Sequence, residues 1–265
     1  MKYFLLSALL LLGITSITKA DEADAKAILE KSADATSRLK SLKADMVTET
    51  FASTTPQHGT YFQKKMPDGT LLMRVEMNLP AAASAEGTTS TPPSSYTLLS
   101  PQGIYTVTGN KAIRMDGMPG MDKIKDVMNS DTLKSAAQAS DINYAITTGE
   151  VDGKECWVVS IPTTAAALES IRNTLSQGLP KELLAGQKIR VDAIPIPAKT
   201  VMSIDKQTYL IIKHEGIDAN NKVIQSTTFQ NQQSNIELPD ELFKLSDHIK
   251  IETIESIIQQ LPTGK

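Results

Sequence analysis

The side chains that could do chemistry are few and scattered in this chain of 265 residues. The histidines are His58, His214 and His248, and none has a second ligand at the spacing that a zinc site needs. Cys156, the single cysteine, is typical of a small buried strand residue, with an intermolecular bridge as the alternative. The sequence contains no nucleophile-elbow, phosphate-loop or dinucleotide-binding motif. We therefore expect no enzymatic activity, no metal and no cofactor.

Methionine is the residue type with the most informative placement. The stretch "RMDGMPGMDKIKDVM", residues 114–128, holds Met115, Met118, Met121 and Met128 among two glycines and a proline. The methionine side chain is unbranched and polarizable, so it repacks around apolar groups of varied shape. Sites that accept varied apolar ligands use methionine for that reason. The segment predicts a flexible rim or lid over an apolar site; ordinary core packing is the alternative.

Residues 1–20 have the pattern of a cleaved signal peptide. Lys2 precedes the apolar run "FLLSALLLLGI", and small residues lead up to a cleavage site after Ala20. Cleavage removes Lys2 and Lys19, which leaves 25 basic and 30 acidic side chains and a net charge of −5. Such a charge argues against nucleic acid as a partner. The residue directly after the cleavage site is Asp21 and not a cysteine, so we expect a periplasmic protein without a lipid anchor.

The elements that must position these residues are mostly strands. The clearest strand is "GTLLMRVEMN", where one face is continuously apolar and the other ends polar. A turn is expected at "TPQHG" and a hairpin around "EVDGKE". Helical spacing of apolar residues predicts helices over 22–45, 164–185 and 248–265, whereas residues 80–95 have the low complexity of a mobile loop.

Together these elements predict an α+β fold, in which about ten antiparallel strands form a curved half-barrel with helices over one face. We expect one domain over residues 21–247, followed by the C-terminal amphipathic helix at 248–265. A curved sheet of this size encloses space that side chains do not fill. The residues expected to line that cavity are Leu71, Met73, Val75, Met77, Trp157, Val159, Leu210 and Ile212. A strand register shifted by one residue would turn the whole set away from it.

The order of elements resembles the LolA/LolB-like lipoprotein carriers. The resemblance covers most of residues 22–245 and lies in "LKSLKADM", in "GTYFQKKMPDGTLLMRVEM" and above all in "SIDKQTYLIIKHEGIDANNKVIQSTTFQN" followed by "IELPDELFKL". It implies an eleven-stranded half-barrel with a helical lid over a cavity for acyl chains. It also implies an inner-membrane donor and an outer-membrane acceptor. This chain has Lys64 and Lys65 where those carriers have an arginine that holds the lid closed, and lysine lacks the planar hydrogen-bonding fork of arginine.

The sequence thus predicts a periplasmic carrier or chaperone for the acyl chains of lipoproteins or lipids, active in transfer toward the outer membrane. The alternative is a periplasmic regulatory module that senses lipoproteins or docks a partner protein. In that alternative the C-terminal helix would dock on the partner protein. The other possible role of this helix is to pack on the parent domain.

Overall fold

The computed structural model describes residues 22–51, 53–78, 95–115, 130–139, 142–178, 195–253 and 256. Within these residues a single open sheet is built from strands β1 (Ser41–Thr50), β2 (Ser53–Lys65), β3 (Leu71–Asn78), β4 (Ser95–Ser100), β5 (Gly103–Thr108), β6 (Lys111–Arg114), β7 (Ala145–Val151), β8 (Lys154–Pro162), β9 (Lys199–Asp205), β10 (Ile211–Ile217), β11 (Val223–Ser234) and β12 (Lys250–Thr253). The described helices are α1 (Glu22–Ser37), α3 (Ser130–Gln138), α4 (Ala165–Gly178) and the 3₁₀ turn η2 (Asp240–Phe243).

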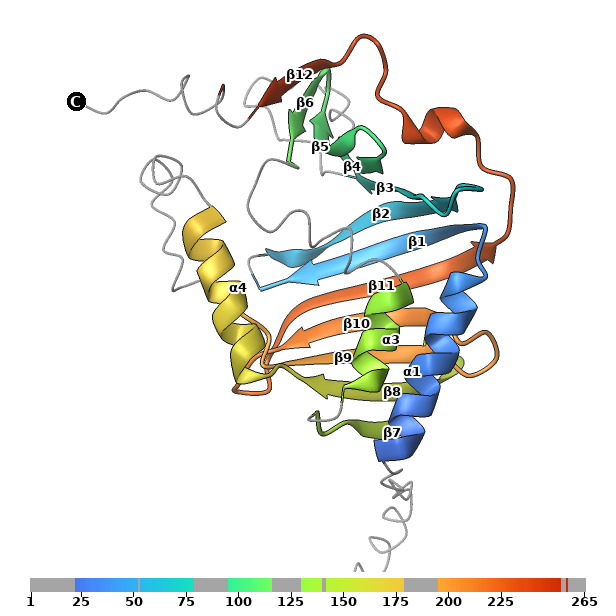
Figure 1. Cartoon of the computed structure of the whole chain (residues 1–265), viewed down its shortest axis with the longest axis vertical. Coiled ribbons are helices and arrows are strands. Elements are labelled where there is room, and N and C mark those ends of the chain that lie inside the picture. The colour runs from blue at the N-terminus through green and yellow to red at the C-terminus, as the bar shows by residue number, and fades with distance from the viewer. Residues whose placement is uncertain are drawn as a thin grey trace, which may run out of the picture.

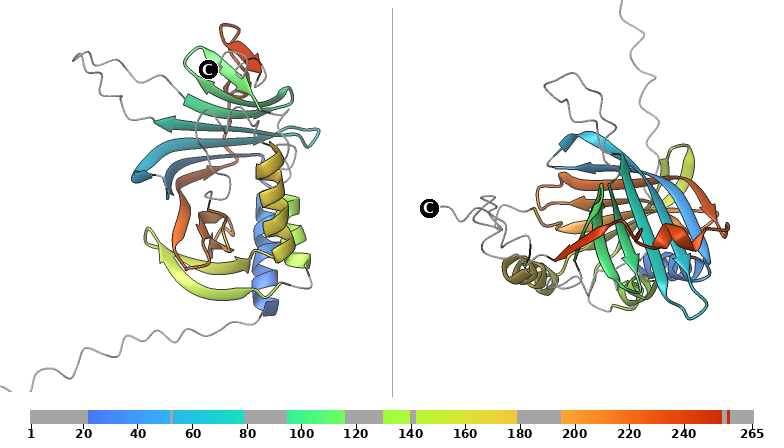
Figure 2. Two further views of the ribbon diagram at one scale, coloured as in Figure 1. Left: turned by 90° about the vertical axis from the view of Figure 1, so that its left-hand side faces the viewer. Right: turned by 90° about the horizontal axis from the view of Figure 1, so that it is seen from above.

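The strand order is β12-β6-β5-β4-β3-β2-β1-β11-β10-β9-β8-β7. Neighbouring strands are antiparallel except for β12, which pairs parallel with β6. The first and second halves of the chain therefore meet at the β1–β11 pair. The sheet curves, and α1, α3 and α4 stand on the same side of it (Figures 1 and 2). This architecture confirms the predicted curved α+β half-barrel.

The main core lies between α1, α3 and the β7–β10 part of the sheet. The buried residues of this cluster are Ala25, Ile28, Leu29, Ala137, Tyr144, Ile146, Val159, Met202 and Ile204. Trp157 and Ile161 pack against it, so β8 presents alternate residues to the helices. We call this side of the sheet the inner face.

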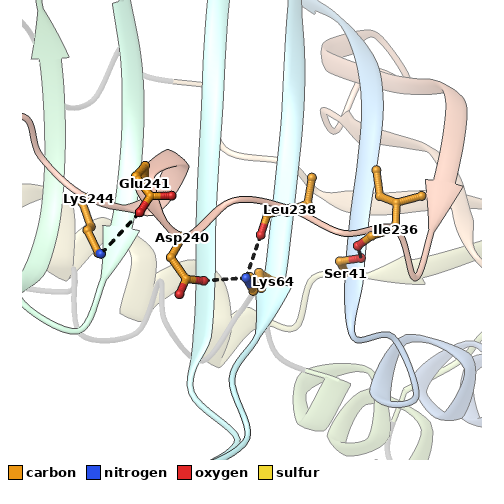
Figure 3. Close-up of polar contacts among 7 residues, drawn as sticks. All are labelled: Ser41, Lys64, Ile236, Leu238, Asp240, Glu241 and Lys244. Atoms are coloured by element: carbon orange, nitrogen blue, oxygen red, sulfur yellow. Dashed lines mark hydrogen bonds and ion pairs between the residues drawn. The ribbon is translucent and has the colours of Figure 1, made fainter.

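A segment that we call the strap, residues 235–249, crosses the opposite or outer face after β11 (Figure 3). Leu238 and Phe243 of the strap are buried against Leu72, Leu98 and Val107, with three further members of the cluster on β4–β6. The Ser41 hydroxyl and the Lys64 ammonium both donate hydrogen bonds to strap carbonyls, at 2.5 Å and 2.7 Å. The strap ends at β12, which then extends the sheet beside β6.

Three predicted features differ from the structure: the end of one helix, one turn and one whole element. The N-terminal helix, expected over 22–45, ends at Ser37, because Leu42, Ala44 and Met46 are buried with the period of a strand. The turn expected at "TPQHG" lies inside β2, where a register shift opposite Thr48–Thr50 accommodates the proline. At residues 250–253 the structure has β12 instead of the expected helix. Residues 254–255 and 257–265 lie outside the described part.

Candidate functional site

The register of β3 places its predicted site residues on the inner face. Leu71, Met73, Val75 and Met77 pair in turn with Lys65, Gln63, Tyr61 and Gly59 of β2. Tyr61 packs against the buried cluster that contains Met73, and also against the cluster that contains Leu39, on which Ala35 of α1 packs too; this fixes the side of the sheet. Gly59 is needed in this row, because a Cβ atom there would collide with the Glu76 carbonyl oxygen.

Met73 and Val75 belong to an apolar cluster that we call the inner patch. Its buried members are Met73, Leu99 and Ile104, and its partly buried members are Tyr61, Val75 and Met115. Every described member comes from β2–β5 or from the residue after β6, and none comes from a helix. Met115 is held against the patch by a backbone hydrogen bond of 2.8 Å from its N–H to the Ile104 carbonyl. The first methionine of the predicted lid segment thus lies on the inner patch.

The other predicted site residues lie apart from the inner patch. Val159 is fully buried under α1, and Trp157 packs against the same cluster with the Lys206 ammonium 5.0 Å from its ring centroid. Leu210 is buried with Leu39 and Leu42 near the end of α1. Ile212, also buried, sits at a register shift between β9 and β10. Val159, Leu210 and Ile212 are thus core residues, and the partly buried Trp157 packs against the core.

Met118, Met121 and Met128 lie outside the described residues. The predicted loop at 80–95 lies outside them as well, except for Ser95 at the start of β4. The role of all twelve predicted residues as acyl-chain contacts remains a prediction.

Sequence reasoning missed three members of the inner patch, Tyr61, Leu99 and Ile104. Tyr61 donates a hydrogen bond of 2.7 Å to the Gln63 side chain, and its ring meets that of Phe229 edge-on with centroids 5.5 Å apart. Burial strongly raises the pKa of its phenol, so it stays neutral. Leu99 and Ile104 are direct cross-strand partners in the β4–β5 hairpin. Extending the β3 alternation through that hairpin would have found both.

The side chains of Lys64 and Lys65, which precede Pro67 in the sequence, lie on opposite faces of the sheet. The Lys64 ammonium lies on the outer face, 2.5 Å from the Asp240 carboxylate of the strap (Figure 3). The Lys65 ammonium instead donates to the Ser37 carbonyl, at 3.1 Å, where α1 ends. A cation at that end interacts favourably with the helix dipole. Lys65 therefore contacts a helix of the inner face, the side on which the resemblance places an arginine latch.

The polar groups of the described residues form no reactive cluster. His58 lies on the outer face in β2, His214 on the inner face in β10 and His248 in the strap. Cys156 is buried in β8, and burial raises the pKa of its thiol. Over the described ranges no group of three His, Cys, Asp or Glu side chains is placed to hold a metal ion. Asp205 accepts turn hydrogen bonds from the N–H groups of Gln207 and Thr208, both 2.8 Å.

No helix in the described part of the chain has both the length and the apolar character needed to cross a bilayer.

Comparison with known proteins gives a likeness of fold only. No family model matches the chain, and no curated protein matches its sequence. A conserved protein from Thermus thermophilus has a TM-score of 0.50 at 9% identity, over 87% of this chain and 99% of that one. The MucA/MucB complex of Pseudomonas aeruginosa gives 0.46 at 11% identity over 87% of this chain, which spans 64% of the matched chain's length.

A LolA superfamily protein from Nitrosomonas europaea is also among the similar structures, with a TM-score of 0.32 at 10% identity, over 83% of this chain and 97% of that one. The described residues form a curved half-barrel, as the resemblance implied, and the likeness to these structures is one of fold alone. Identities this low carry no ligand or partner over to this chain.

Proposed function

We propose that this protein is a carrier that binds the acyl chains of lipids or lipoproteins on the inner patch. The observation that supports it most directly is the make-up of that patch. It combines methionines with Val75, Leu99 and Ile104 on the helix side of the sheet, yet none of its described members is a helix residue. Methionine tolerates apolar partners of varied shape, which suits a ligand whose chains differ in length and unsaturation.

The energetics require a cover for such a site. Burying one methylene is worth about 0.8 kcal/mol, so a sixteen-carbon chain is worth on the order of 12 kcal/mol. Two or three chains would exceed the practical ceiling of roughly 20 kcal/mol for binding. A carrier that must release its cargo therefore needs an opposing cost. We assign that cost to the segment 114–128, whose methionines cover the patch when no ligand is bound and are displaced when a ligand enters.

In this proposal the protein is exported by a cleaved signal peptide and acts in the periplasm. It receives acylated cargo from an inner-membrane donor and passes it to an acceptor at the outer membrane. The neutral, apolar inner patch supports binding of acyl chains, whereas the donor and the acceptor rest on the LolA-like resemblance alone.

The proposal is tested by native mass spectrometry of the purified protein titrated with a dipalmitoyl lipopeptide. The wild type is expected to form a one-to-one adduct. Val75→Asp places a carboxylate in the half-buried inner patch, where burying it costs several kcal/mol, so binding should weaken about a hundredfold or more. Thr228→Asp is the control, because Thr228 faces outward opposite Lys213 and should leave the adduct unchanged.

Circular dichroism of both variants checks that each is folded. A wild-type mass that stays bare throughout the titration would overturn the carrier function and favour the regulatory alternative. Equal binding by Val75→Asp and the wild type would remove the inner patch from the site.

A further inference from the structure

A row of uncharged polar side chains crosses the inner face next to the apolar residues. His214 of β10 pairs directly with Thr227 of β11, Thr227 with Thr48 of β1, and Thr48 with Gln57 of β2. Direct cross-strand partners share a face, and His214 also pairs with Met202, which packs under α1. We call these four residues the polar row.

The side chains of the polar row can form more hydrogen bonds than they make in the structure. The Thr48 and Thr227 hydroxyl oxygens are 3.4 Å apart, so one hydroxyl donates weakly to the other and the second keeps its proton for another acceptor. Among the described residues no hydrogen bond is made by the side chain of Gln57 or of His214. Burial lowers the pKa of His214, which keeps its imidazole neutral at pH 7 with one N–H to donate. All four side chains are partly buried.

The strands around the polar row offer no cation to an ionised ligand. On β1–β6 and β9–β11 the inward-facing strand residues of the described part include one charge beyond the helix-capping Lys65, that of Lys111 at the far edge. The Lys111 ammonium lies 3.2 Å from the Glu252 carboxylate, which neutralises it. A phosphate or carboxylate group at the polar row would be partly buried without a counter-charge, which is costly. The row therefore suits an uncharged acceptor.

The distance from the inner patch to the polar row is within the reach of an acyl chain. On β2, Tyr61 of the inner patch and Gln57 of the polar row face the same side and are four residues apart. At about 3.3 Å per residue this separation is roughly 13 Å. Half of a bilayer's hydrocarbon core, the depth filled by one layer of chains, is about 15 Å. A chain lying on the patch along the strands can thus carry its polar linkage to the row.

We propose that the polar row binds the ester linkage of a diacylglyceryl group, its hydroxyl and N–H groups donating to the ester carbonyls while the acyl chains lie on the inner patch. This inference rests on the proposed carrier function and names the chemical class of its ligand. The same diacylglyceryl group occurs in a free glycerolipid and at the acylated end of a lipoprotein, so the test includes both sources.

Three ligands are titrated by isothermal calorimetry: dioctanoylglycerol, its dialkyl ether analogue, which lacks the carbonyls, and a diacylglyceryl-cysteine peptide of equal chain length. The uncharged hydrocarbon diphenylhexatriene, followed by fluorescence, reports on the apolar site alone. Thr227→Val and Gln57→Leu remove donors from the row. Thr228→Val is the matched control, because Thr228 is the next residue of the same strand and faces outward.

Thr227→Val and Gln57→Leu should each weaken both ester ligands about tenfold and leave the ether analogue and diphenylhexatriene unchanged, while Thr228→Val changes nothing. Tighter wild-type binding of the peptide identifies a lipoprotein source, and tighter binding of dioctanoylglycerol a free lipid. Unaltered ester affinity in both row variants, with hydrocarbon binding intact, overturns the polar-row assignment and leaves the carrier function standing. Failure of the wild type to bind any of the ligands overturns the carrier function itself.

Discussion

Strand β3 shows that adjacent residues of one strand lie in different environments. Met73 and Val75 face the inner patch, whereas Leu72 and Arg74 between and beside them face the strap. The alternation predicted one apolar and one solvent-exposed face. In the structure the outer face is covered too: the Arg74 guanidinium lies 3.7 Å from the centroid of the Tyr96 ring and donates to the Leu242 carbonyl at 3.1 Å. An arginine in a strand therefore marks cation–π packing here and not exposure.

His214 makes the stability of the protein depend on pH. Burial lowers its pKa below the value of about 6.5 that it has in the unfolded chain, while Glu215, paired at 2.9 Å with Lys213, opposes this more weakly. As pH falls below about 6.5 the unfolded state takes up the proton first, so the free energy of unfolding decreases until the lowered pKa is reached. Urea unfolding at pH 7.5 and 5.5 should show a smaller loss of stability for His214→Gln than for the wild type.

The control for that comparison is His58→Gln, because His58 is exposed on the outer face of β2. Its stability should change with pH as that of the wild type does. An equal pH dependence in His214→Gln and the wild type would show that His214 does not titrate differently in the folded state.

At the scale of elements, Lys64 makes two of the polar contacts that hold the strap on the outer face. Lys64 bridges the Leu238 carbonyl and the Asp240 carboxylate, and its ammonium lowers the pKa of that carboxyl (Figure 3). Lys64→Met keeps the apolar stem and removes both contacts, so we expect a melting temperature roughly 2–4 °C lower. Differential scanning calorimetry measures it.

Lys244→Met serves as the matched change on the strap itself. The Lys244–Glu241 pair is 3.9 Å long and largely exposed, so its loss should move the melting temperature by no more than about 1 °C. If the two variants melt at the same temperature, Lys64 does not anchor the strap.

The sequence predicted those elements that are encoded by residues close together in the chain. The hairpin at Asp152 and Gly153 forms as expected, with both residues at positive φ in the turn. Met73 and Val75 both lie on the inner face because β3 alternates without interruption. The strap and β12 could not be predicted, because their short apolar stretches are positioned by packing and pairing with residues of β2–β6, which are far away in the chain. The helix–strand boundary after Ser37 was missed because Leu42 fits both periods.

At the scale of the whole molecule, stability should vary across the sheet with distance from its centre. Strands β1 and β11 are flanked on both sides, whereas β7 and β12 each have a free edge among the described residues. Amide hydrogen exchange is therefore expected to be slowest in β1 and β11 and fastest in β7 and β12. Mass spectrometry of peptides covering the four strands tests this order. Protection of β12 equal to that of β1 would contradict it.

The pairing of β1 with β11 also dictates the order in which the protein can fold. The hairpins of β1–β6 form from neighbouring residues, but β1 stays an open edge until residues 223–234 have been synthesised. The outer face of β2–β6 likewise keeps Tyr96, Leu98 and Tyr105 in water until the strap arrives. Pairings this distant in the chain slow folding and lengthen the life of intermediates that aggregate. The folding intermediate that a chaperone would need to bind is thus the sheet of β1–β6, in which both edge strands are still unpaired.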